Sequence, residues 1–260
     1  MEQVSEIKIS SIITAKNEEA NIRECINRQL NCIDEIIVIV DDKTTDKTLD
    51  IVKEFPQVKY EVKRWEGFAE TKKYAASLAN NDWVLWIDAD EVISDELSKE
   101  IQNFKNTHPD YNIYEIPRKA YFLGKWILHS GWYPGYVHRL FNKNKVSFNS
   151  KKVHEGLDYS GQSGRLKGDI LHYTDRNINH YFSKFNSYTS LAANSLFEEK
   201  KKFRIYDILL RPVFMFLKMY ILKAGFLDGI QGFILAVFSS LYVFTKYCKL
   251  WELERKSKNK

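Results

Sequence analysis

The sequence reads WVLWIDADE from Trp83 to Glu91, and this stretch decides the fold that we predict. Five large apolar residues followed directly by acids are typical of a buried central strand that delivers carboxylates to one edge of a sheet. Asp88 and Asp90 stand one residue apart at that end. Carboxylate oxygens suit Mg²⁺ or Mn²⁺, and such a cation turns a bound diphosphate into a leaving group. The stretch therefore predicts a candidate metal and diphosphate site.

The alternative is that these acids only cap the helix that follows. Ser94 suits that role better, because Asp95 and Glu96 occupy the first turn of the predicted helix. Apolar residues then follow at helical spacing. They are Ile93, Leu97, Ile101 and Phe104. We therefore predict a helix capped by Ser94 and keep Asp88 and Asp90 as candidate ligands.

Strands and helices alternate before Trp83. Predicted strands run over 7–15, 35–40 and 58–62, and a helix follows each of them. This pattern predicts a parallel sheet with right-handed crossovers, and ligands of such sheets bind at the carboxyl ends of the strands. We therefore expect three strand ends to form one site. They are Thr14-Ala15-Lys16, Asp41-Asp42 and Asp88-Ala89-Asp90.

No glycine-rich phosphate-binding motif follows either of the first two strands, so the sequence does not support ATP hydrolysis or NAD chemistry. We expect instead that acids hold the base and ribose of a nucleotide and that a metal holds its phosphates. Lys72 and Lys73, on the helix before Trp83, are candidates for added positive charge. For any single lysine, a solvated helix face is the competing interpretation.

Residues 112–173 are rich in aromatic side chains. Some must belong to the core, but aromatic rings beside polar groups are also typical of sugar-binding clefts. These residues are Tyr121, Phe122, Trp126, Trp132, Tyr133, Tyr136, Phe141 and Phe148. His154 precedes Glu155 directly, and His172 follows a short predicted strand. Each histidine alone is more often a structural hydrogen-bonding residue than a catalytic one or a metal ligand.

The charge of the chain is concentrated in its last quarter. Residues 197–260 hold 13 Lys and Arg against 6 Asp and Glu, a net charge of +7, whereas the whole chain carries +5. A basic, apolar and aromatic tail suggests an anionic membrane surface at least as strongly as a nucleic acid. The acidic start of the chain lacks the pattern of a signal peptide, and three cysteines without paired spacing fit a reducing compartment. We therefore predict a cytoplasmic protein without disulfides.

The C-terminal region predicts helices. Residues 177–199 form an amphipathic pattern with Tyr181, Phe185, Tyr188, Leu191 and Ala192 facing inward. Segments 205–223 and 229–249 are apolar but interrupted or short of the roughly twenty residues that a membrane span needs. We therefore predict interfacial or re-entrant helices that attach the protein to one face of a membrane. The alternative is a helical pair packed on the catalytic domain or on another subunit.

Three motifs together resemble family 2 glycosyltransferases of GT-A fold. They are Ser11-Ile12-Ile13-Thr14-Ala15-Lys16-Asn17-Glu18, Val40-Asp41-Asp42-Lys43-Thr44-Thr45-Asp46 and Trp86-Ile87-Asp88-Ala89-Asp90-Glu91. Later motifs resemble the branch of bacterial lipopolysaccharide inner-core β-1,4-glucosyltransferases. These are Gly131-Trp132-Tyr133-Pro134, Arg139-Leu140-Phe141, Val153-His154-Glu155-Gly156, Leu166-Lys167-Gly168-Asp169, His172-Tyr173 and Gly225-Phe226-Leu227-Asp228-Gly229.

The resemblance implies inverting transfer from a nucleoside-diphosphate sugar without a covalent enzyme intermediate. On the donor side, Asp41 matches the acid that reads the base, Thr14 and Glu18 lie in the loop around the nucleoside, and Lys72 matches a basic position near the phosphates. Asp88 is expected to contact both the donor and the metal.

The remaining roles concern the reacting centre. Asp90 is the expected direct metal contact and a catalytic residue, and His172 is a further contact to the metal or diphosphate. Glu155 is the predicted base that deprotonates the acceptor hydroxyl, because a carboxylate can accept a proton as the hydroxyl attacks.

Two positions depart from the family pattern. Asp42-Lys43-Thr44 stands where relatives commonly have small residues, which affects the geometry of the turn. Gly135 stands where relatives frequently have an acid. If that acid is the base in relatives, either Asp158 or Glu115 replaces it here or activity is lost.

We therefore predict an α/β protein of GT-A fold, a Rossmann-like and mostly parallel sheet flanked by helices, with a C-terminal helical appendage that associates with membrane. The catalytic domain is expected over 1–176, with a nucleotide-sugar half at 1–111 and an acceptor half at 112–176, and the appendage over 177–260. The predicted enzyme is a metal-dependent hexosyltransferase that uses Mg²⁺ or Mn²⁺ and UDP-glucose.

The predicted acceptor is a lipid-linked lipopolysaccharide core at the cytoplasmic face of the inner membrane, and no nucleic acid is expected as a partner. Two alternatives remain open. The same donor chemistry can serve another acceptor, such as a polyprenyl phosphate, a capsule intermediate or a peptide. The chain can also be a non-catalytic domain that binds a nucleotide sugar.

Overall fold

The computed structural model describes residues 6–149, 156–175 and 177–258. The chain divides into two compact units. The first unit comprises Met1–Arg118 and Gly135–Tyr173, and the second comprises Lys119–Pro134 and Thr174–Lys260. The stretch 119–134, which precedes β8, therefore belongs with the C-terminal helices.

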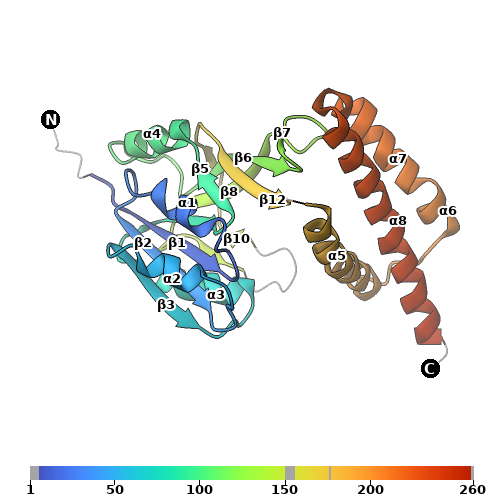
Figure 1. The fold of residues 1–260 in the computed structure, drawn as a ribbon, viewed down its shortest axis with the longest axis horizontal. Helices are drawn as coiled ribbons and strands as arrows, with labels where there is room; N and C mark the ends of the chain where they lie inside the picture. Colours follow the sequence, from blue (N-terminus) through green and yellow to red (C-terminus); the bar gives the residue numbers. More distant parts are fainter. Residues whose placement is uncertain (1–5, 150–155, 176, 259–260) are drawn as a thin grey trace. The chain divides into compact units, whose positions relative to one another are not determined.

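The N-terminal part of the first unit is the predicted parallel sheet (Figure 1). Its strands are β1 (Ile9–Ala15), β2 (Glu35–Asp41), β3 (Val58–Lys63) and β4 (Trp83–Asp88), in the order β3-β2-β1-β4. All three neighbouring pairs are parallel. Thr14 is the register partner of Asp88, so the ends of β1 and β4 meet at one edge of the sheet.

Antiparallel strands extend the sheet beyond β4. The order continues as β8 (Gly135–Asn142), β6 (Ile113–Phe122), β12 (Ile170–Asp175) and β5 (Glu91–Ile93). Four short strands complete the list, namely β7 (Lys125–Ile127), β9 (Ser147–Phe148), β10 (Leu157–Asp158) and β11 (Gly164–Arg165). The sheet is thus mixed, with its parallel part on the N-terminal side.

Helices cover both faces of the parallel strands. One face packs against α1 (Ile22–Asn27), α2 (Thr48–Lys53) and α4 (Asp95–Phe104), and the other packs against α3 (Phe68–Ser77) and β9. Alternate residues of β4 enter the two cores, Leu85 on the first side and Trp86 on the second. Burial on both faces explains why this strand is apolar without interruption.

The second unit is a helical bundle with the β7 hairpin. Its helices are α5 (Ile178–Glu198), α6 (Ile205–Leu209), α7 (Arg211–Leu217), the π-helix η1 (Lys218–Leu222), the 3-10 helix η2 (Gly225–Asp228) and α8 (Ile230–Lys258). α8 packs along α7 and along α5. The predicted start of α5 is confirmed, since Asn177 caps it by accepting the N–H of His180 at 2.8 Å.

The predicted inner face of α5 is partly wrong. Tyr188 and Leu191 are 55% and 44% exposed, whereas Thr189 and Ala193 are buried. Thr189 Oγ1 accepts a hydrogen bond from Lys249 Nζ of α8 at 2.8 Å. The buried face of α5 therefore includes the polar residue Thr189, which a hydrophobicity pattern places on the solvent side.

Among the described residues, α8 is the one helix long and apolar enough to cross a membrane by length and composition. It runs past the predicted limit of residue 249 to Lys258. This is weak evidence for membrane association, because the core helix of a soluble protein can meet the same criterion.

Ser94 gives a first test of this fold. Its hydroxyl accepts the N–H of Leu97 at 3.2 Å, as predicted for a cap, and also the N–H of Asp169 at 3.0 Å. Ser94→Ala removes both bonds, and we expect a loss of about 1–2 kcal/mol in the free energy of unfolding, measured in urea. Ser94→Thr keeps the hydroxyl and should lose less; an equal loss in both variants would contradict the capping role.

Candidate functional site

Asp41 ends β2 as a buried carboxylate. The N–H of Lys43 donates to its Oδ1 at 2.8 Å, and Lys16 Nζ lies 2.9 Å from its Oδ2. Burial raises the pKa of Asp41, but the contacts with Lys16 and the Lys43 N–H outweigh burial and leave that pKa below its ordinary value. Asp41 therefore remains an ionised hydrogen-bond acceptor at the edge of the sheet.

The loop after β2 forms without small residues. The N–H of Thr44 donates to the carbonyl of Asp41 at 2.9 Å, which closes a turn. Positive φ angles among the described non-glycine residues do not include Asp42, Lys43 or Thr44. The departure from the family pattern in this loop is therefore compatible with an ordinary turn, stabilised by the Asp41 carboxylate.

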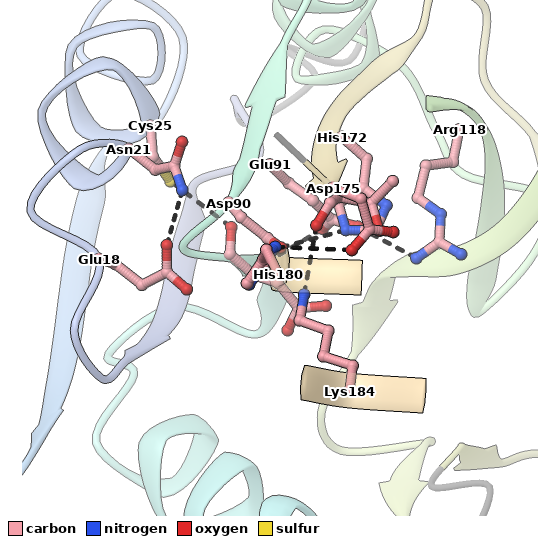
Figure 2. A network of polar contacts seen from close by, with 12 residues as sticks. Glu18, Asn21, Cys25, Asp90, Glu91, Arg118, His172, Asp175, His180 and Lys184 are labelled. Carbon is pink, nitrogen blue, oxygen red and sulfur yellow. Dashed lines mark hydrogen bonds and ion pairs between the residues drawn. The ribbon is translucent and has the colours of Figure 1, made fainter. Parts of the chain in front are cut away.

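Hydrogen bonds join the loops after β1 and β2. The N–H of Glu18 donates to Thr48 Oγ1 at 2.7 Å, and the N–H of Thr45 donates to Asn17 Oδ1 at 2.8 Å. Asn21 Nδ2 donates to Glu18 Oε2 at 2.7 Å (Figure 2). The predicted nucleoside residues Thr14, Glu18 and Asp41 thus lie on one connected edge of the first unit.

Asp88 is held by two cations at the end of β4. Lys72 Nζ lies 3.1 Å from its Oδ1, and Arg139 Nη2 donates to its Oδ2 at 2.8 Å. Trp86 Nε1 also donates to Oδ1, at 3.1 Å. Burial raises the pKa of Asp88, but Arg139 and then Lys72 outweigh burial and hold that pKa far below its ordinary value.

Lys72 comes from α3 and is 1% exposed, so a solvated helix face is the wrong interpretation for this lysine. Its Nζ lies 3.9 Å from the centroid of the Trp86 ring. Because an ammonium group loses hydration when it is buried, the Asp88 carboxylate and the ring have to compensate for that loss.

Arg139 is a site residue whose role the sequence did not indicate, although it stands in the motif Arg139-Leu140-Phe141. It is 2% exposed, its Nη2 donates to Glu91 Oε1 at 2.6 Å as well as to Asp88, and its guanidinium carbon lies 4.1 Å from the Trp86 centroid. Burial lowers the pKa of Arg139, but Glu91 and Asp88 hold it above the ordinary value. Glu91, also buried, accepts the N–H of Asp88 at 3.0 Å.

A β-bulge occurs at Arg139 in the pairing of β8 with β6. The register pairs Tyr114 with Leu140 and then Glu115 with His138, so Arg139 has no opposite residue on β6. An extra residue of this kind bends the strand and turns a side chain away from its regular direction. The alternation of apolar and polar residues in the sequence does not reveal such a bulge.

Asp90 and His172 lie next to each other. His172 Nε2 is 3.2 Å from Asp90 Oδ2, and both side chains are partly exposed (Figure 2). The carbonyl of Asp90 accepts the N–H of Tyr173 at 2.9 Å, which fixes the loop after β4 to β12. Two residues that the resemblance implies as metal contacts, Asp90 and His172, thus lie together.

The donor atoms of this pair fit a divalent cation. A carboxylate and an imidazole can hold Mn²⁺ or Mg²⁺ when phosphate oxygens and water complete its coordination. Asp88 fits less well, because each of its oxygens already faces a cation. No group of three or more candidate ligand residues occurs in the part of the chain that the structure describes.

The predicted base Glu155 lies outside the described residues. Of its alternatives, Asp158 is an exposed residue of β10, and Glu115 accepts a hydrogen bond from Arg165 Nε at 2.6 Å. Gly135 begins β8 and is the register partner of Arg118. The assignment of the base stays a prediction.

Arg139 provides a test of the charge cluster. Arg139→Gln takes the shared cation from the buried Glu91 and the partly exposed Asp88, and we expect a loss of about 3 kcal/mol in urea unfolding. Because the folded pKa of Asp88 is depressed, its stabilisation is present above about pH 4 and is lost as the pH falls further. The variant loses most of this stabilisation by Asp88, so its free energy of unfolding should depend less on pH below about pH 4.

The matched control is Arg23→Gln, which removes an exposed arginine from its pair with Glu54. We expect its urea midpoint and its acid profile to follow those of the unaltered protein. If Arg139→Gln behaves in the same way, the buried cluster does not stabilise the fold.

Comparisons with known proteins agree with this geometry. The family model described as glycosyl transferase family 2 matches residues 10–168. A Rickettsia typhi protein described as an uncharacterised glycosyltransferase is 34% identical, over 97% of this chain and 89% of its own length. The lipopolysaccharide core biosynthesis glycosyltransferase LpsC of Rhizobium meliloti is 27% identical, over 96% of this chain and 94% of its own length.

Among solved structures, the mannosyltransferase PcManGT from Pyrobaculum calidifontis, in complex with GDP-Man and Mn²⁺, superposes with a TM-score of 0.55 at 11% identity. The match covers 96% of this chain and 88% of that one, which confirms the predicted GT-A fold. Because the family model covers more than half of the sequence, the chain belongs to glycosyl transferase family 2.

Proposed function

We propose that this protein transfers a hexose, with glucose as the expected sugar, from a nucleoside-diphosphate sugar to a lipid-linked lipopolysaccharide core. The observation that carries the donor chemistry is the juxtaposition of the ion-paired Asp88 with Asp90 and His172 at the end of β4. The similarity to LpsC supports the choice of acceptor.

Each residue has a proposed task. Asp41, kept ionised by Lys16, accepts hydrogen bonds from the base of the donor, and Glu18 shapes the loop around the nucleoside. Asp90 and His172 hold a divalent cation, which when bound neutralises the diphosphate leaving group. Lys72 and Asp88 keep the adjacent strand end in place.

The proposed transfer inverts the anomeric centre in one displacement. A base of the protein accepts the proton of the acceptor hydroxyl as that hydroxyl attacks, and Glu155 is our choice for this base. The divalent cation that Asp90 and His172 would hold would favour departure of the diphosphate, because it would stabilise the charge that develops there.

Asp90→Asn tests the donor site. We expect at least a hundredfold loss of UDP-glucose hydrolysis and of transfer, because the amide provides a weaker cation ligand than the carboxylate. Mn²⁺ titration followed by electron paramagnetic resonance should show weaker binding to the same variant. Asp50→Asn, an exposed acid on α2, is the matched control; equal Mn²⁺ affinity and equal hydrolysis in both variants would refute the assignment.

Mass analysis of lipid-linked glycans from a strain without this gene tests the acceptor. One missing hexose on the lipopolysaccharide core is the expected result. A missing hexose on another lipid-linked or peptide product would assign the same donor chemistry to that acceptor. A protein that binds UDP-glucose without hydrolysis or transfer, with no change in any glycan, would be the non-catalytic domain.

A lipid-linked acceptor agrees with the surface of the second unit. Within 205–230, eleven apolar side chains are more than one-third exposed. They are Ile205, Leu209, Leu210, Val213, Phe214, Leu217, Ile221, Leu222, Phe226, Leu227 and Ile230. Water-exposed apolar surface of this extent marks a binding surface on a soluble protein.

Helical spacing gathers further apolar residues on one side of α8. Phe233, Val237, Leu241 and Phe244 follow at intervals of three or four residues, and each is 38–41% exposed. Exposed basic residues accompany this surface, among them Arg204, Arg211, Lys218 and Lys223. We propose that the second unit attaches to the anionic cytoplasmic face of the membrane, since apolar burial and attraction to acidic headgroups act together there.

Vesicle co-sedimentation tests the membrane surface. We expect the protein to bind vesicles with about one-third phosphatidylglycerol, to bind pure phosphatidylcholine weakly, and to lose binding when Leu210 and Phe214 are both changed to Glu. Val62→Glu, at a similarly exposed apolar position on β3, is the matched control. If the double variant instead only dissolves a dimer seen by light scattering, the surface is an interface between copies of this chain.

A further inference from the structure

One face of the sheet in the first unit carries a row of polar side chains beside the Arg139 bulge. The register places Arg165 of β11 opposite Glu115 of β6, and Glu115 opposite His138 of β8. Residues directly opposite each other on neighbouring strands point to the same face. Arg165 Nε donates to Glu115 Oε1 at 2.6 Å, so part of the row is already an ion pair.

Two tyrosines extend this row. Tyr136 precedes His138 by two residues on β8, and the Arg165 guanidinium carbon lies 4.3 Å from the centroid of its ring. Tyr159 Oη lies 3.2 Å from His138 Nε2, with the two ring centroids 5.1 Å apart. Tyr136 and Tyr159 are nevertheless 41% and 37% exposed. We call Tyr136, His138, Tyr159 and Arg165, together with Glu115, the tyrosine platform.

The platform lies close to the donor site. His138 directly precedes Arg139, whose guanidinium holds Asp88. At about 3.3 Å per residue, Tyr136 stands roughly 10 Å along β8 from Arg139. Both belong to the same compact unit, so this proximity is fixed by the strand. A molecule on the platform is therefore within reach of the reacting centre.

The chemistry of the platform matches a sugar. Aromatic rings accept the C–H faces of a pyranose, and fixed polar groups beside them take its hydroxyls. Glu115 provides acceptors, Arg165 provides donors, and the tyrosine hydroxyls provide both. An ordinary solvated sheet face also carries polar residues, but here each exposed ring contacts a charged or polar group that orients it.

We propose that the tyrosine platform binds a pyranose ring of the acceptor, with Tyr136 as its main stacking residue. This inference rests on the proposed transferase function and adds the protein surface that recognises the acceptor. The donor residues contact the nucleotide sugar independently of the platform. Loss of the platform should therefore weaken binding of the acceptor and leave binding of the donor unchanged.

Tyr136→Ala tests the proposal, with lipopolysaccharide from a strain lacking the gene as acceptor and UDP-glucose as donor. We expect the KM for this acceptor to rise about tenfold, while UDP-glucose hydrolysis in the absence of acceptor stays within about twofold. Tyr136→Phe retains the ring and should restore the low KM. Tyr60→Ala is the matched control, because Tyr60 is 44% exposed on β3, the far edge strand of the same sheet.

Saturation-transfer NMR with the core oligosaccharide released from the same lipopolysaccharide separates this proposal from the transferase function. The platform is supported if the unaltered protein gives oligosaccharide signals and Tyr136→Ala loses them. This holds even if UDP-glucose is never turned over. No oligosaccharide signal from the unaltered protein, or an unchanged acceptor KM in Tyr136→Ala, overturns it.

Discussion

The charge cluster of Arg139 with Asp88 and Glu91 is the interaction on which the first unit depends. Four separate elements contribute to it, since Asp88 ends β4, Glu91 begins β5, Arg139 lies in β8 and Lys72 comes from α3. Arg118 adds a further ion pair to Glu91 at 3.4 Å, so each acid of the cluster faces two cations, which offsets the large cost of removing its charge from water. Loss of Arg139 removes the one cation that Asp88 and Glu91 share.

Asp88 and Asp90 look equivalent in the sequence, but the cluster gives them different surroundings. Asp88 contacts Lys72 and Arg139 through separate oxygens, and its depressed pKa reflects those contacts. Asp90 is partly exposed and lies beside His172. A carboxylate whose two oxygens already face protein cations gains less from a metal, so the two acids are not interchangeable.

The donor side of the fold was predictable because its signals are local. Of the four parallel strands, β1, β2 and β4 end where a buried run meets polar residues. Ser94 and Asn177 begin helices through caps within three residues. The face of α5 was harder to predict. Tyr188 and Leu191 are apolar yet exposed, whereas Thr189 is buried with a hydrogen bond to α8. A pattern of hydrophobicity cannot distinguish these cases, because the partner helix is far away in the sequence.

The acceptor side depends on strand register, which the sequence does not display. Without the bulge at Arg139, β8 would shift by one residue against β6, and every side chain beyond that point would change face. Tyr136 and His138 would then point away from Glu115. Arg139 shares the face of Phe141 and Trp86 by ordinary alternation, whereas the extra residue turns His138 and Tyr136 to that same face. One strand therefore carries the cation of the charge cluster and the proposed acceptor surface side by side.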